Sequence, residues 1–502
     1  MISKPIFKQS FKANWRLWVI ITTVASIILS GFIISYDAAG YASIAAAAEG
    51  TAFSSILSSM TSILGSLENF YKLIAVILGI VYVVFTANNL VVNEVDSGSM
   101  AYTLSTPIKR SSVIFTKSLY LILSVALMYI IISLSGLGAL QLQYNNVTGY
   151  PITDDIKAAS ETLNQDERYV SKRLYLIKAD EYAMLEASMA RDMDTDAYSI
   201  YLENLINHRS YKETAEIITD ERWDLYENDE DMEDSDIEIT TEELAGNPQL
   251  ILTSNDALTA GARIHGISIN EYREFVLNEI EMLEAEDENV QTEEIKVDVQ
   301  NTEETQESSN PTMMITEDNA ELLLQSVINA SATALSMDSG QISDNLTWIK
   351  NPTALAFSTE TTGLNEEQII MMANHAMVSS AKSVDEALDF DIEVYFWLSI
   401  GLLLLILAMS SISFFASTLF NRTGLALAIG GGIPFAFFLI TMIQQLMDNV
   451  DGLEYITLTS LFDTDAILAS GEFGWGLVAL GVITLVLYTA SNILFTKKDL
   501  PL

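Results

Sequence analysis

The sequence predicts an all-α membrane protein with six transmembrane helices and a large acidic domain between the third and the fourth. Half of its 502 residues are hydrophobic and its mean hydropathy is +0.28, which is too apolar for an ordinary soluble protein. The acidic residues, in contrast, are concentrated in one stretch. Residues 142–390 hold 53 of the 67 Asp and Glu but 14 of the 25 Lys and Arg, so about −39 of the formal net charge of −42 lies there.

The first 16 residues predict a cytosolic amphipathic helix. Two series recur at a spacing of four, the basic one being Lys4, Lys8, Lys12 and Arg16 and the aromatic one Phe7, Phe11 and Trp15. On a helix they form neighbouring stripes, which is typical of a helix in the membrane interface. We expect this helix to turn into the first transmembrane helix. The alternative, a cleaved signal peptide, is disfavoured because the apolar run that follows is longer than a signal core.

Six apolar runs are long enough to cross a bilayer, which takes about 20 residues of helix. They cover residues 17–34, 73–92, 113–140, 395–420, 425–446 and 474–495. The sequence therefore predicts one block of three transmembrane helices in residues 17–141 and another in residues 391–502. An even number of spans places both termini on the same side of the membrane.

Basic residues near the span ends predict the orientation, because such residues stay in the cytosol. With cytosolic termini, the cytosolic segments carry nearly all of them, including Lys109, Arg110 and Arg422, whereas the short outer segments carry only Lys72. Residues 142–390 are then extracellular. The chain has no cysteine, and a large external domain without disulfides is ordinary in bacteria. We therefore expect a multi-pass protein of a bacterial cell membrane.

The external domain is expected to be mainly helical, with linkers near residues 226–245 and 284–311. Apolar residues recur at helical spacing from residue 153 to residue 218, whereas the linkers are acidic. Capping patterns predict three helix starts. They are Ser268 with Glu271, Asn365 before residues 368–380, and Ser383 with Glu386, the last leading into the fourth span.

One acidic pattern resembles a calcium-binding loop. Asp192, Asp194 and Asp196 alternate, and Glu203 occupies the twelfth position counted from Asp192, as in an EF-hand. The sixth position, however, is Ala197, where the sharp turn of such a loop needs glycine. The pattern is more typical of an acidic helix junction, and we expect no metal.

Motifs for catalysis and for nucleotide binding are absent from the sequence. The three histidines are far apart and form no HExxH, and there is no Gly-x-Ser-x-Gly elbow and no Walker phosphate loop. We therefore expect no catalytic residue, no enzyme activity, no ATP binding by this chain alone and no nucleic-acid partner. The scarcity of charge inside the apolar runs disfavours proton relays and charged ion channels.

The polar loop at residues 93–111, between the second and third runs, has a defined predicted shape. Pro107 cannot continue a helix, so the helix leaving the second run must end before it. Thr106 can cap a new helix that carries Pro107 in its first turn. Residues 96–104 are then a short helix with an apolar face of Met100, Ala101 and Leu104. An exposed face of this kind suits docking into a partner's groove, although an ordinary interfacial turn is the alternative.

This loop resembles the hallmark of type-2 ABC exporter permeases, the ABC-2-like family. The family pattern is an acid, a Gly-Ser or Gly-Thr pair, a Leu, Thr-Pro, an Arg and a Lys after the second span. The matching residues are Glu94, Gly98, Ser99, Met100, Leu104, Pro107, Arg110 and Lys117. The loop is especially similar to a Gram-positive branch with a large extracellular insertion between spans three and four. The resemblance covers the six spans, about half of the chain.

The resemblance implies a function and partners. Permeases of this family work as homo- or heterodimers, and each contacts a separate cytosolic ABC ATPase through the loop. ATP and magnesium would bind to that ATPase, so no cofactor is expected on this chain. Closure of the ATPase dimer would be transmitted through the loop to the spans. We add the hypothesis that Glu94 and Arg110 pair and hold the loop rigid.

The expected cargo is amphipathic: a peptide, a drug or a lipid-like molecule moved out of the cell. Polar residues that interrupt the spans mark a possible path, namely Asn88, Asn89, Ser410, Gln444 and Gln445. Hydrogen bonding between helices is the alternative explanation for them. The acidic exterior would attract cationic peptides. A second class of function therefore stays open, a membrane-anchored receptor or sensor whose outer domain binds cationic peptides.

Overall fold

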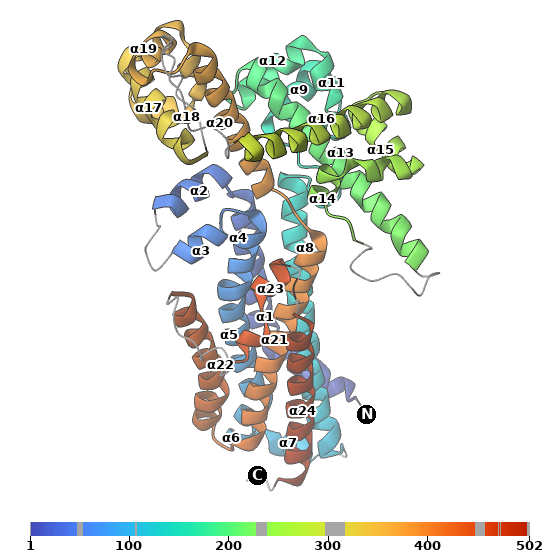
Figure 1. Cartoon of the computed structure of the whole chain (residues 1–502). Coiled ribbons are helices and arrows are strands. Elements are labelled where there is room, and N and C mark those ends of the chain that lie inside the picture. Colours follow the sequence, from blue (N-terminus) through green and yellow to red (C-terminus); the bar gives the residue numbers. More distant parts are fainter. Residues whose placement is uncertain are drawn as a thin grey trace. The chain divides into compact units, whose positions relative to one another are not determined.

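The computed structural model describes residues 2–47, 54–105, 108–226, 238–296, 317–446, 457–469, 471 and 473–498. None of these residues lies in a strand, and helices are the dominant element. The chain divides into two compact units, one of Met1–Thr148 with Glu386–Leu502 and one of Gly149–Asp385 (Figure 1). The predicted all-α fold with six membrane-crossing helices is confirmed.

The six spans all belong to the first unit. They are α1 (Lys4–Ile34), the continuous helix of α4 (Ile63–Asn69), a π-helical turn (Phe70–Ala75) and α5 (Val76–Leu90), then α8 (Arg110–Gln143), α21 (Ile392–Leu419), α22 (Thr423–Leu446) and α24 (Gly474–Lys497). The second span begins ten residues before the apolar run that predicted it. The reason is that Glu68 and Lys72 pair with each other inside the helix, so two charges do not end it.

The predicted interfacial helix is not a separate element. α1 runs without a break from Lys4 to Ile34, because its one proline, Pro5, lies in the first turn, where proline is tolerated. In its first half, Ile6, Ser10 and Asn14 are buried, while the basic residues and the aromatic residues Phe11 and Trp15 are exposed.

α21 lies at the centre of the bundle. It is the most buried of the six spans and contacts α5, α8, α22 and α24. Hydroxyl groups tie it to its neighbours: Tyr395 Oη donates to the carbonyl oxygen of Ser133 at 2.8 Å, and Tyr71 Oη lies 3.1 Å from Ser399 Oγ. Inside a bilayer, such bonds and close packing replace the hydrophobic effect as the force that joins helices.

Short helices flank the spans of this unit. α6 (Val92–Asp96) and α7 (Met100–Leu104) lie at the end of the bundle that also holds both chain termini, and α2 (Ala38–Ala47) and α3 (Ser54–Ser59) lie at the other end (Figure 1). Between α22 and α24, a 3-10 turn, η6 (Thr459–Leu461), and α23 (Thr464–Leu468) pack back against the spans.

The second unit is built around two hydrophobic cores. The N-terminal half of α13 (Thr195–Tyr226) lies in the first core and its C-terminal half in the second. The first core also takes residues from α9 (Asp154–Leu163), α10 (Glu167–Ser171), α12 (Glu181–Ala190), α17 (Glu317–Leu335), α18 (Ser339–Asp344), η4 (Leu346–Lys350), α19 (Pro352–Thr362) and α20 (Glu366–Ala387). The second takes residues from α14 (Thr241–Gly246), η3 (Pro248–Thr253), α15 (Asn255–His265) and α16 (Ile269–Lys296). α11 (Tyr175–Ala179) precedes α12.

Two of the three predicted helix starts are confirmed by reciprocal hydrogen bonds, those of Ser268 with Glu271 and of Asn365 with Gln368. The third is wrong. Ser383 and Glu386 lie inside α20, which continues to Ala387. The fourth span is capped instead by Asp391, whose carboxylate accepts from the backbone N–H of Glu393 at 2.7 Å.

The predicted linkers are partly helical. α16 continues to Lys296, so the first part of the linker near 284–311 is helix, and residues 297–311 lie outside the described residues. In the linker near 226–245, residues 227–237 also lie outside them, and its last part forms most of α14.

Candidate functional site

The residues that follow the second span, 92–104, fold as two helical turns joined at a glycine, and we name them the α6–α7 segment. Gly98 has a φ of +74°, and a Cβ added to it would meet no atom within 4 Å. The glycine is therefore needed for its backbone conformation and not for space. The prediction of one short helix over residues 96–104 is wrong, because this left-handed residue separates α6 from α7.

Glu94 on α6 and Lys117 on α8 form a buried ion pair. The Lys117 side chain is 2% exposed, and its Nζ lies 2.5 Å from Glu94 Oε2. The same ammonium donates to the carbonyl oxygen of Leu90, the last residue of α5, at 2.5 Å. An unpaired charge is costly inside a membrane-spanning bundle, so each charge fixes the position of the other. The pair holds the start of the segment against the third span.

The hypothesis that Glu94 pairs with Arg110 is wrong, because Lys117 takes that place. Arg110 Nη1 donates instead to the carbonyl oxygen of Lys498 at 3.2 Å, just past the end of α24. Lys498 Nζ in turn donates to the carbonyl oxygens of the last two residues of α21, at 3.0 and 2.7 Å. Basic groups at helix C-termini satisfy carbonyl groups that the helix leaves unpaired. The start of α8 is thus tied to the ends of α24 and α21.

Asp96, the last residue of α6, connects the segment to the fifth span. Its Oδ2 accepts a hydrogen bond from the backbone N–H of Thr423 at 3.1 Å. Thr423 is the first residue of α22, so the carboxylate satisfies an N–H group at a helix start and complements the helix dipole there. The contact joins residues 327 positions apart in the sequence.

The predicted docking face is turned inward. Met100 is fully buried, and Leu104 is half-buried against the core of the bundle. The turn at Gly98 lets α7 fold back, so its apolar side packs onto the spans. The side chain that projects from α7 is Tyr102, which is 81% exposed.

The other predicted loop residues have local roles or lie outside the described residues. Ser99 Oγ donates to the carbonyl oxygen of Glu94 at 3.3 Å and closes the turn around Gly98. Pro107 and Thr106 lie outside the described residues. The backbone of Lys109 is extended and α8 begins at Arg110, so the helix that leads into the third span begins after the start predicted at Thr106.

Together these contacts connect the α6–α7 segment to most of the bundle. A displacement of the segment acts directly on α8 through Lys117 and on α22 through Asp96. It acts on α24 and α21 through the contacts at the start of α8. The arrangement is suited to passing a movement from this end of the bundle into the spans.

A family model described as ABC-2 family transporter protein matches residues 5–158. The match supports an ABC-2 type permease. It covers α1, the second span, the α6–α7 segment and α8, but not α21, α22 or α24. No curated protein matches the chain. A permease of this type is a transport component and is not itself catalytic.

The residues predicted to mark a possible cargo path lie in three places. Asn88 and Asn89 are near the end of α5, Ser410 is buried in α21, and Gln444 is near the end of α22. The side chain of Gln445 lies outside the described residues. Ser410 Oγ lies 2.7 Å from the Tyr488 hydroxyl of α24. This is a hydrogen bond between two helices, which is the alternative explanation for a polar residue in a span. The cargo path stays a prediction.

The carboxylates of the calcium candidate do not come together. The four residues are Asp192, Asp194, Asp196 and Glu203. Asp194 caps α13 and lies 2.5 Å from Lys350 Nζ, while Glu203 pairs with Lys178 at 3.1 Å. Because helix begins at residue 195, the twelfth position is carried about 12 Å along the axis and cannot close a loop. In the described parts of the chain, no three Asp, Glu, His or Cys side chains are placed to hold a metal ion.

A buried charged cluster joins the first and last helices of the second unit. Arg191 Nε lies 3.1 Å from Asp155 Oδ1, and Arg191 Nη2 lies 2.8 Å from Asp385 Oδ1. Tyr198 donates to Asp155, and Tyr201 donates to Asp385. Burial alone would lower the pKa of the Arg191 guanidinium, but the two carboxylates raise it well above its ordinary value. The cluster is a structural tie within this unit.

The sequence reasoning missed Glu68, a buried carboxylate within the second span that is 3% exposed. It precedes Lys72 by four residues. A carboxylate four positions before a lysine on a helix is a signal that could have revealed it.

Proposed function

We propose that this chain is the membrane-spanning subunit of an ATP-driven exporter that moves amphipathic cargo, a peptide, a drug or a lipid-like molecule, out of a bacterial cell. The family match supports a membrane permease of an ABC transporter. The observation that carries the proposal is the α6–α7 segment, whose ion pair and cap connect it to the third and fifth spans. A separate cytosolic ATPase, with ATP and magnesium, would supply the movement.

Tyr102 is the residue on which the ATPase would dock. An exposed ring with a polar tip is a frequent anchor at protein interfaces, and this ring is the exposed side chain of α7. A movement of the ring is passed inward by Met100, which is fully buried two residues away. Glu94 then passes the movement to Lys117 and the third span.

The orientation belongs to the proposal. We place the chain termini and the α6–α7 segment in the cytosol and residues 142–390 outside the cell. Lys109 and Arg110 lie at the start of α8, Arg422 lies between α21 and α22, and Lys498 follows α24. Arg110 and Lys498 contact each other and Lys498 contacts the end of α21, so these basic residues gather at one end of the spans, which the positive-inside rule places in the cytosol. Lys72, near the other end of the second span, is paired with Glu68.

A second permease chain, identical or related, is expected to complete the transporter. α1, α22 and α24 are the least buried spans in the described chain, and their outer sides carry large apolar residues such as Leu425 and Phe435 of α22. Lipid or a second chain can cover these sides. The mass of the purified complex in nanodiscs distinguishes one copy from two.

Co-purification tests the proposal. The full chain, expressed at its native level, should retain an ATPase subunit, and ATP hydrolysis by the complex should rise with cargo. Tyr102→Ala should weaken the association at least about tenfold, because removal of an interface anchor often costs more than about 1.4 kcal/mol. Tyr182→Ala is a matched control, since Tyr182 is 74% exposed but lies in the second unit. Failure of the wild-type chain to retain any ATPase would reject the exporter.

One observation favours the second candidate function, a receptor for cationic peptides. The second unit holds 51 acidic and 14 basic residues, and α12 exposes an apolar stripe of Tyr182, Leu185 and Met189 beside Glu181 and Glu186. A cationic amphipathic helix complements both features. A receptor would bind such a peptide with salt-sensitive affinity in the absence of any ATPase, and Leu185→Ser would weaken the binding.

A further inference from the structure

We propose that residues 457–468 form a gate near the end of the bundle opposite the α6–α7 segment, and that the buried carboxylate of Glu68 latches it. The proposal rests on the proposed transport function, because a permease needs a barrier that opens. The gate consists of η6, α23 and the residues beside them, and it joins α22 to α24 in the sequence.

The gate is seated in the bundle. Phe462 and Ile467 are buried in the same hydrophobic core as the spans. A Cβ added to Gly476 of α24 would lie 2.2 Å from the carbonyl oxygen of Leu461, so the two backbones touch and only glycine fits at this position. Within the described chain, the gate contacts α4, α21, α22 and α24. It therefore bridges four helices that would separate if the bundle opened at this end.

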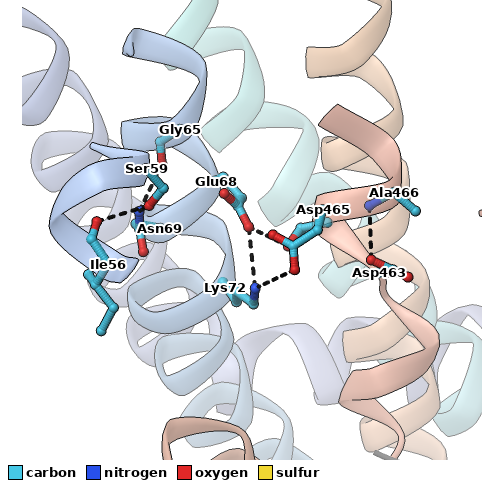
Figure 2. A network of polar contacts seen from close by, with 10 residues as sticks. Ile56, Ser59, Gly65, Glu68, Asn69, Lys72, Asp463, Asp465 and Ala466 are labelled. Atoms are coloured by element: carbon cyan, nitrogen blue, oxygen red, sulfur yellow. Dashed lines mark hydrogen bonds and ion pairs between the residues drawn. The ribbon is translucent and has the colours of Figure 1, made fainter. Parts of the chain in front are cut away.

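The latch is a polar network between α4 and α23. Thr464 Oγ1 donates to Glu68 Oε1 at 2.5 Å, and both residues are buried. Lys72 Nζ lies 3.3 Å from the same carboxylate oxygen and 3.5 Å from Asp465 Oδ2. Figure 2 shows Glu68, Lys72 and Asp465 converging between the two helices.

The charges are arranged so that the latch can open. Glu68 and Lys72 lie on one continuous helix, so they stay paired when α23 moves away. Asp465 has a side chain that is 80% exposed, so water replaces its ion pair with Lys72 at little cost. Within this polar network, opening therefore breaks one strong contact, the hydrogen bond from Thr464 to a buried carboxylate, and it leaves no charge without a partner.

The second span contains an irregular helical turn next to the latch. Lys72 lies in the π-helical turn Phe70–Ala75, and such turns occur often at functional sites. Tyr71, in the same turn, lies 3.1 Å from Ser399 Oγ of α21 and 3.4 Å from Ser133 Oγ of α8. A change at the latch is thus connected to the central span and to the third span, which also holds Lys117.

Labelling of a single cysteine tests the latch without an ATPase or a cargo. The chain has no natural cysteine, so Ile467→Cys, at a position 1% exposed, reports opening of the gate through its rate of reaction with maleimide. In the full chain in nanodiscs, Thr464→Val should raise this rate about tenfold, because it keeps the shape and loses the hydroxyl. Thr464→Ser, which keeps the hydroxyl, should leave the rate unchanged.

A second buried position separates gate opening from general loosening. Leu121→Cys on α8 is fully buried and should stay unreactive in every variant. If Thr464→Val does not change the rate at which position 467 reacts with maleimide, the proposal is overturned. It is also overturned if Thr464→Val raises the reaction rate at position 121 as much as at position 467.

A disulfide between gate and span separates failure of the gate from failure of the proposed function. The hydroxyls of Thr441 on α22 and Thr459 in the gate are hydrogen-bonded, so Thr441→Cys with Thr459→Cys places two thiols side by side. In the reconstituted complex, oxidation should stop transport while the ATPase stays bound, and reduction should restore transport. Full transport by the oxidised form rejects the gate. A chain that never binds an ATPase rejects the exporter and leaves the labelling result intact.

Discussion

Removal of Glu94 should destabilise the protein more than removal of Lys117, although the two residues form one ion pair. The side chain of Lys117 is 2% exposed and that of Glu94 is 19% exposed. Without Glu94, the ammonium stays buried with the Leu90 carbonyl as its known partner, and loss of one member of a buried pair costs about 3–5 kcal/mol. Without Lys117, the carboxylate can reach water, so we expect a cost of about 1–3 kcal/mol.

Unfolding of the full chain in nanodiscs of one lipid composition checks this asymmetry. The variants are Glu94→Gln, Lys117→Met and the double variant. Because the double variant leaves no charge behind, it should be more stable than Glu94→Gln alone, with a coupling energy of about 2 kcal/mol. Equal losses in the two single variants, or strictly additive losses in the double variant, would refute the reasoning.

Three further predictions concern single residues. Burial lowers the pKa of His265 to about 4, and the charge of Lys178 adds to the effect. In the unfolded chain this pKa is about 6.5, so between about pH 6.5 and pH 4 the unfolded state binds more protons than the folded state. The free energy of unfolding therefore falls as the pH falls. Hydrogen exchange in α15 and α16 should show a loss of about 2 kcal/mol from pH 7 to pH 5, which His265→Phe removes. Tyr102→Phe should retain most of the ATPase binding that Tyr102→Ala loses, measured by co-purification. Calcium should leave the melting temperature unchanged, whereas Asp194→Ala should lower it because the helix cap and the ion pair with Lys350 are lost.

The spans could be predicted because each depends on length and hydropathy, which are local properties of the sequence. The caps at Ser268 and Asn365 could be predicted for the same reason, since both partners lie within three residues. Ser383 satisfies the same pattern but lies inside α20. A capping pattern marks a place where a helix can begin. Whether a helix begins there, or a preceding helix continues through it, depends on packing.

The sequence predicted a polar segment between the second and third spans, but it predicted the wrong contacts for that segment. The choice of Lys117 over Arg110 as the partner of Glu94 depends on which side of α8 faces α6, which a loop sequence does not contain. The cap that Asp96 places on α22 joins residues 327 positions apart, so no local pattern could reveal it. The prediction that the apolar face of α7 is exposed was wrong, because it assumed one continuous helix over residues 96–104. Gly98 has a left-handed backbone conformation, which ends α6 and redirects α7.

The chain passes between the two units near residues 149 and 385. In each unit, the two chain segments next to these points are held together by contacts within that unit. In the second unit, a single guanidinium, Arg191, holds Asp155 near one end and Asp385 at the other. In the first unit, Asn146 Nδ2 donates to the carbonyl oxygen of Leu388 at 3.0 Å, so the two chain segments that leave the spans contact each other within that unit. Each unit therefore holds its own two chain segments together at the point where the chain passes into the other unit. We expect that another domain or a short loop could replace the second unit while the contacts among the six spans are kept.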